Sequence, residues 1–62
     1  MSMKEALELF VDKKIDVLMT GQTQAQCGTL TEVCIDWFVM QTNNSKQYFD
    51  ITKTVTFWEH KE

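Results

Sequence analysis

The side chains of this 62-residue chain that could carry chemistry include two cysteines and one histidine. Cys27 and Cys34 stand seven residues apart with no Cys-x-x-Cys pair, and His60 is far from both. Tetrahedral zinc sites take four ligands, usually as two close pairs, so this spacing predicts no metal site. A disulfide between the two cysteines across a hairpin is the alternative to two reduced thiols, and we expect thiols in a reducing compartment.

Acid–base chemistry would depend on Asp16, Asp36 or Asp50. None of them stands at a spacing from a cysteine or histidine that indicates a catalytic pair. His60 lies in the charged segment 59–62 and is expected to be solvated. The sequence also lacks a phosphate-binding loop and a nucleophile–base pair, so it predicts no enzyme and no cofactor.

Length and composition predict a single globular domain over residues 1–62, with 44% apolar and 24% charged residues. So short a chain buries only about 60% of its extended surface, and such domains commonly need a disulfide, a metal or a partner subunit. Six lysines, no arginine and a net charge of −3 disfavour strong phosphate binding. No apolar run approaches the roughly 18 residues of a membrane span, and no secretory signal is visible. We therefore expect a cytoplasmic protein with no membrane partner.

The elements that would position these residues are a helix over residues 2–12 and five strands over residues 14–58. A capping box at Ser2 and Glu5 begins the helix, and three- and four-residue apolar spacing continues it. Alternating residues then predict strands. Their expected ranges are 15–20, 23–33, 35–41, 46–51 and 54–58. Gly21-Gln22 is the candidate tight turn after the first strand, and Gly28 is the candidate bend of the second.

This order of elements resembles the Sm-like (LSm) family, including its bacterial Hfq-type branch. The resemblance is carried by Gly28-Thr29-Leu30-Thr31-Glu32-Val33, Asp36-Trp37-Phe38-Val39-Met40 and the pair of segments 48–51 and 54–57. It implies a mainly β fold with a short N-terminal α-helix, in which a strongly bent, five-stranded antiparallel sheet forms a small open barrel, as in Sm-like and SH3-like domains. The segment from Gly28 to Asp36 is about two residues longer than in the commonest Sm pattern, and the family's Met-Asn pair is missing.

Sm-like proteins assemble as head-to-tail rings of five to eight copies, in which the fourth strand of one subunit pairs with the fifth of the next. The resemblance therefore implies a homo-oligomer with proline-free, β-prone edges. The interface candidates are Trp37, Gln47, Ile51, Val55, Phe57 and Trp58. For Trp37, core packing is the alternative.

The resemblance also implies single-stranded RNA binding in post-transcriptional regulation. The candidate residues are Phe38, Lys46, Tyr48, Phe49, Asp50 and Lys53, with core packing as the alternative for the three rings. The Hfq-type branch has Tyr-Lys-His where this chain has Tyr48-Phe49-Asp50, so two basic side chains are replaced. The alternative functions are a ring that serves as a protein-interaction scaffold and a monomeric SH3-like adaptor that binds a peptide at its sheet edge.

Overall fold

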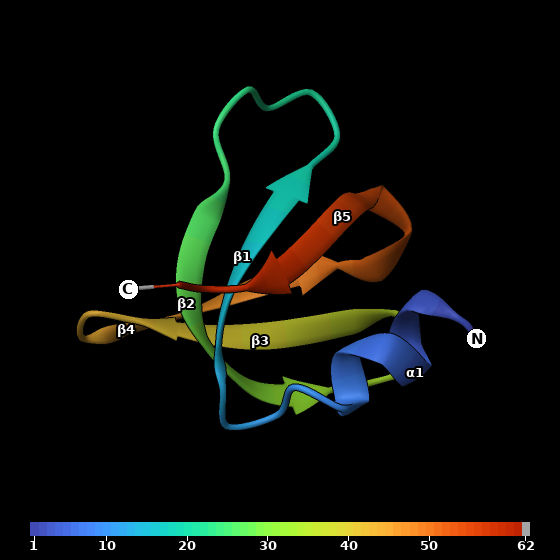
Figure 1. The fold of residues 1–62 in the computed structure, drawn as a ribbon, viewed down its shortest axis with the longest axis horizontal. Coiled ribbons are helices and arrows are strands. Elements are labelled where there is room, and N and C mark those ends of the chain that lie inside the picture. The colour runs from blue at the N-terminus through green and yellow to red at the C-terminus, as the bar shows by residue number, and fades with distance from the viewer. Residues whose placement is uncertain (62) are drawn as a thin grey trace.

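The computed structural model describes residues 1–61 as a short helix followed by one five-stranded antiparallel sheet (Figure 1). The elements are α1 (Met3–Glu8), β1 (Lys14–Met19), β2 (Gln26–Val33), β3 (Trp37–Thr42), β4 (Ser45–Asp50), the 3₁₀ turn η1 (Ile51–Lys53) and β5 (Thr54–Glu59). The strand order is β4-β3-β2-β1-β5, so the sheet is not closed into a barrel and β4 and β5 are its edges. The predicted mainly β fold is confirmed.

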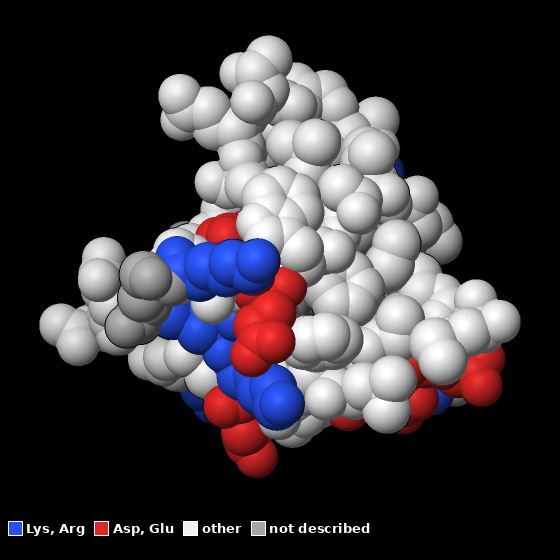
Figure 2. Space-filling model, viewed as in Figure 1, with Lys and Arg blue, Asp and Glu red and all other residues white. Residues whose placement is uncertain are grey.

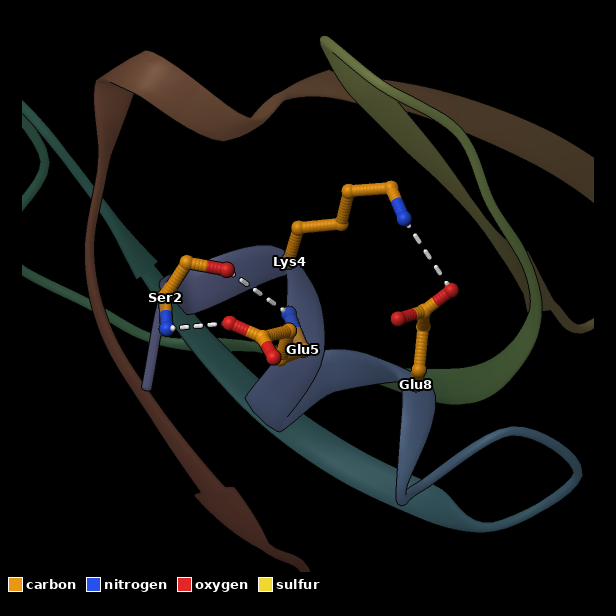
Figure 3. Close-up of polar contacts among 4 residues, drawn as sticks. All are labelled: Ser2, Lys4, Glu5 and Glu8. Carbon is orange, nitrogen blue, oxygen red and sulfur yellow. Dashed lines mark hydrogen bonds and ion pairs between the residues drawn. The ribbon is translucent and has the colours of Figure 1, made fainter.

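Helix α1 begins at the predicted capping box (Figure 3). The Ser2 hydroxyl accepts a hydrogen bond from the Glu5 amide at 3.1 Å, and the Glu5 carboxylate accepts one from the Ser2 amide at 3.0 Å. Lys4 forms an exposed ion pair with Glu8 one turn later. A helix this short is not stable alone, and the buried Leu7 anchors it to the sheet.

The predicted C-terminal end of the helix, at residue 12, is wrong. Helical structure ends at Glu8, and Asp12 adopts a positive φ of 72°. The amide of Asp12 donates to the Leu30 carbonyl at 2.7 Å, and the Leu30 amide donates to the Lys13 carbonyl at 3.0 Å. Hydrogen bonds to β2 therefore engage the Asp12 amide and the Lys13 carbonyl, which would form intrahelical hydrogen bonds in a longer helix.

The connection between β1 and β2 is longer than the predicted turn at Gly21-Gln22, because β2 begins at Gln26 rather than at residue 23. Pairing between β1 and β2 ends at Val17 and Gln26. Beyond that point the chain is drawn toward η1, because Thr20 donates to the Lys53 carbonyl from its amide at 2.8 Å and from its hydroxyl at 2.9 Å. The intervening loop projects from the sheet at the top of Figure 1.

Gly28 lies where the curved strand β2 crosses close to β3, as expected for a glycine inside a bent strand. A Cβ atom at this position would lie 2.7 Å from Cγ2 of Thr42 and 3.0 Å from the carbonyl oxygen of Gln41. Real Cβ atoms essentially never approach other atoms as closely as the first of these distances. Glycine is therefore required by the close approach of two strands.

Strand β3 supplies the centre of the core, with Phe38, Val39 and Met40 all buried. The ring of Phe38 stacks on that of Phe49 with centroids 5.3 Å apart. Strand β3 begins at Trp37 instead of the predicted residue 35, and Ile35 is exposed in the preceding loop. The other members of the core cluster are Leu7, Ile15, Val17 and Leu30.

Strand β5 pairs with β1 through Glu59, one residue beyond its predicted end. The pairing continues with a hydrogen bond of 2.9 Å from the His60 amide to the Lys14 carbonyl. The prediction of a solvated tail over residues 59–62 is therefore wrong for His60, which is half-buried. Glu59 is exposed as expected but belongs to β5, and Glu62 lies outside the described residues. Within residues 1–61, no helix is long and apolar enough to cross a membrane.

Candidate functional site

Polar side chains from three adjacent strands meet around Asp16, on the face of the sheet opposite the core. Asp16 stands between Ile15 and Val17, whose side chains are fully buried, so its own side chain points to the other face. Its cross-strand partner on β2 is Cys27, and its partner on β5 is Trp58. Directly opposed residues of antiparallel strands have adjacent side chains. The topology therefore places a carboxylate between a thiol and an indole.

His60 completes this cluster from the end of β5. Its Nδ1 lies 3.1 Å from both carboxylate oxygens of Asp16. Both side chains are partly shielded, with 28% of the His60 side chain and 16% of the Asp16 side chain exposed. One ligand atom from each of Asp16, Cys27 and His60 can be chosen so that all three lie within 4.8 Å of one another. Spacing along the sequence does not indicate this group, which strand pairing brings together.

The environment of Asp16 favours its ionised form. Burial by itself raises the pKa of this carboxyl, but hydrogen bonds from His60, Cys27 and Trp58, together with the charge of His60, outweigh burial and lower the pKa below its usual value. A carboxylate with three neighbouring donors is an acceptor centre that can hold a cation or a donor group.

Cys34 is separate from this cluster. Neither Cys27 nor Cys34 forms a disulfide within residues 1–61. Cys27 lies near the start of β2 and Cys34 directly after its end, so about 3.3 Å of rise per residue separates them by roughly 20 Å. A disulfide requires Cα atoms within about 7 Å, so the alternative of a hairpin disulfide is excluded by position. Burial and a hydrogen bond of 3.2 Å to the Glu32 carboxylate raise the pKa of the Cys34 thiol.

Three of the residues predicted to contact RNA have structural roles. Phe38 and Phe49 stack on each other in the core, and only 8% of Phe49 is exposed. Asp50 caps η1, because its Oδ1 accepts hydrogen bonds from the Thr52 amide at 2.9 Å and from the Thr52 hydroxyl at 2.7 Å. These bonds lower the pKa of Asp50. Neither buried ring offers a free face to a nucleotide base.

The other RNA candidates lie on or beside the edge strand β4. Tyr48 is 67% exposed and shares one face of β4 with Lys46, two residues earlier. Its ring contacts that of Trp37, with centroids 5.6 Å apart. Lys53 lies in η1, at the far end of β4 from Lys46. The structure therefore places Tyr48 between Lys46 and Trp37 on one face, and Lys53 lies beyond the end of β4.

The interface candidates divide between the two sheet edges. Gln47 is exposed on β4, and Val55 and Trp58 are exposed on β5. Phe57 instead faces inward and meets the ring of Phe10 edge-on, at a centroid distance of 5.4 Å. Ile51 is half-buried against the core.

Sequence reasoning missed the cluster at Asp16 because the fifth strand was ended too early. Asp16 and Cys27 lie on consecutive strands, so pairing of those strands could have suggested their contact. The expected range of the fifth strand ends at residue 58. Extending that strand by two residues would have brought His60 to the level of Lys14 and close to Asp16.

Comparison with known proteins supports a family assignment without an activity. No curated protein and no solved structure matches the chain. The family model described as "Domain of unknown function (DUF6897)" matches residues 3–60, which include α1, all five strands and the three residues of the cluster. This chain, a small antiparallel β-sheet domain, therefore belongs to the DUF6897 family.

Proposed function

We propose that this protein is an Sm-like subunit that assembles with copies of itself through its sheet edges and acts as a protein-interaction scaffold. The observation that supports this proposal is the strand order β4-β3-β2-β1-β5. It leaves as edges the two strands that pair between neighbouring subunits in Sm-like rings. Strand edges carry backbone donors and acceptors that readily pair with another chain. A head-to-tail contact of this kind forms a closed ring when the rotation between subunits closes.

The side chains on the edges also suit an interface. On β5, Val55 is 56% exposed and the Trp58 ring is 45% exposed. On β4, Tyr48 presents its ring next to Trp37. Aromatic residues are enriched at subunit interfaces, because they bury a large area at a low cost in conformational entropy. Pairing of β4 with β5 would remove part of this apolar surface from water.

Single-stranded RNA binding is the second candidate, and the exposed ring of Tyr48 beside Lys46 favours it. A base could stack on this ring while the lysine neutralises a phosphate. Against it, the next residue on the same face is the anionic Asp50, which is committed to capping η1. Figure 2 shows lysines interleaved with acidic side chains on the face viewed, not gathered in a patch of one sign. The scaffold function is therefore the better supported of the two.

The assembly is tested by measuring the mass of the full chain in solution. Native mass spectrometry and light scattering at micromolar concentration should give a closed oligomer of five to eight 7.3 kDa subunits, as expected for an Sm-like ring. Val55→Lys should shift the chain toward the monomer, since it puts a charge near the start of the β5 edge. Leu9→Lys is the matched control, because Leu9 is 65% exposed and caps the end of α1, so it belongs to neither edge strand.

Far-UV circular dichroism would verify that both variants remain folded. A monomeric wild-type chain, or an oligomer that Val55→Lys leaves unchanged, would refute assembly through this edge.

The two functions are distinguished by titrating labelled U-rich and A-rich oligonucleotides at two salt concentrations. A scaffold should bind neither more tightly than the millimolar range. Binding in the micromolar range that weakens with salt would overturn the scaffold in favour of RNA binding. For a single strand, the logarithm of the association constant should fall by about 0.7 per phosphate contact for each tenfold rise in salt concentration. Tyr48→Ala should then weaken that binding, whereas Leu9→Ala should not.

A further inference from the structure

The cluster of Asp16, Cys27 and His60 has the composition of a transition-metal site. It offers one carboxylate, one thiol and one imidazole, which are the three ligand types that zinc takes in proteins. Each comes from a different strand or strand end: Asp16 from β1, Cys27 from β2 and His60 from the residue after β5. Backbone pairing fixes all three positions, through the Asp16–Cys27 register and the His60 amide bond to Lys14.

The distances fit one ion bound between the three side chains. The imidazole Nδ1 is 3.1 Å from either Asp16 oxygen, and the three ligand atoms lie within 4.8 Å of one another. Tetrahedral zinc has ligand bonds of about 2.0 to 2.3 Å, which place neighbouring ligand atoms about 3.3 to 3.7 Å apart. Small side-chain rotations would reach that geometry. The strands need not move.

We propose that Asp16, Cys27 and His60 together bind a divalent transition metal ion of the zinc type. The ion replaces the hydrogen bonds that now join these side chains. His60 coordinates through Nδ1, Asp16 through one carboxylate oxygen, and Cys27 as a thiolate whose proton is released to solvent. The ion's positive charge then faces two anionic ligands, which compensates for their shielding from water.

The three protein ligands would leave one coordination position of the metal open. No fourth histidine, cysteine, aspartate or glutamate joins the group within residues 1–61. Three protein ligands leave the fourth tetrahedral position to water, as in zinc sites that exchange ligands, whereas structural sites supply four. Partial exposure of His60 and Asp16 gives water access to that position.

A hydrogen-bond network without metal is the alternative role for these residues, and cobalt binding separates the two. The full chain, purified without metal and kept reduced, is titrated with Co²⁺ and then with Zn²⁺. A thiolate ligand gives a charge-transfer absorption in the near ultraviolet. We expect this band to saturate at one equivalent per chain, to disappear when zinc displaces cobalt, and to accompany a rise in the melting temperature.

The two cysteines provide matched variants. Cys27→Ser should abolish the charge-transfer band and weaken zinc binding about tenfold or more, because losing a ligand costs at least as much as losing a residue that only orients one. Cys34→Ser should leave both unchanged, since Cys34 lies at the other end of β2. His60 follows the last strand and is not a core residue. The variant His60→Gln should therefore fold, and it tests the site even if Cys27→Ser does not fold. Its zinc affinity should fall by a similar factor.

Three results would overturn the proposal. The first is a wild-type chain that gives no charge-transfer band and binds zinc no more tightly than the millimolar range. The second is equal loss of binding in Cys27→Ser and Cys34→Ser. The third is a His60→Gln variant that binds zinc as tightly as the wild-type chain.

Discussion

Replacing Gly28 by alanine should destabilise the fold by steric overlap alone. The new Cβ would meet Cγ2 of Thr42 at 2.7 Å and the Gln41 carbonyl oxygen at 3.0 Å. Thr42 is β-branched and stiff, and the carbonyl belongs to the backbone of β3, so neither can yield without cost. Overpacking of this kind costs about 1 to 3 kcal/mol. The reduced entropy of the unfolded chain recovers about 0.4 to 1 kcal/mol, because the backbone of Gly28 is not in the left-handed region.

From the middle of both ranges, the net loss should be about 1.3 kcal/mol in the free energy of unfolding. Urea denaturation at one protein concentration would measure it, with an unchanged m-value showing that only stability has altered. In a thermal melt each kcal/mol corresponds to about 4 to 8 °C for a domain of this size. Thr42→Ser removes Cγ2, so the double variant should recover about 0.5 to 1 kcal/mol through the interaction energy of a double-mutant cycle. The Gln41 contact should keep the recovery incomplete.

Gly21→Ala is the control for glycine loss without overlap. No atom lies within 4 Å of the position that a Cβ would take there, but the φ of Gly21 is +83°, so the cost of about 1 to 2 kcal/mol is conformational and should not respond to Thr42→Ser. Wild-type stability in Gly28→Ala, or the absence of coupling to Thr42→Ser, would refute the steric explanation.

Two further predictions concern helix caps and the core. Hydrogen bonds from Ser2 to Glu5 and from Thr52 to Asp50 lower both pKa values in the folded state, so the unfolded chain takes up protons first and stability should be lost as the pH falls below about 4. The urea midpoint should fall less steeply with decreasing pH for Asp50→Asn than for the wild-type chain. An equal dependence on pH in the two proteins would contradict the capping role of Asp50. Phe49→Ala should lower the free energy of unfolding by about 3 to 5 kcal/mol, since the ring is buried against Phe38, whereas Tyr48→Ala should cost less than about 1 kcal/mol. Similar losses in these two variants would contradict the assignment of neighbouring rings to opposite faces of β4.

Much of the fold could be predicted because its determinants are local in sequence. The Ser2–Glu5 capping box depends on four consecutive residues. The buried face of β1 follows from the alternation of Ile15 and Val17 with polar residues. Gly28 marked the bend because glycine inside a strand has few other uses. These signals do not depend on knowing which strands are neighbours.

The features that could not be predicted depend on contacts between distant residues. The loop before Gln26 is long because Thr20 bonds to Lys53, a residue 33 positions later. The helix ends early because Asp12 and Lys13 pair with Leu30. No local pattern distinguishes these outcomes from a tight turn or from one more helical turn. Strand pairing decided both.

The cluster at Asp16 depends on strand pairing in the same way, and this separates the two proposals. All three candidate ligands come from one chain, so metal binding requires the sheet to form but does not require a second subunit. Assembly requires instead the free edge of β5, where Val55 lies. Trp58 belongs to both regions, because it is the cross-strand partner of Asp16 while its ring stays partly exposed on β5. A metal ion at Asp16 would tie the end of β5 to β1 and β2, and would thereby hold in place the strand on which assembly depends.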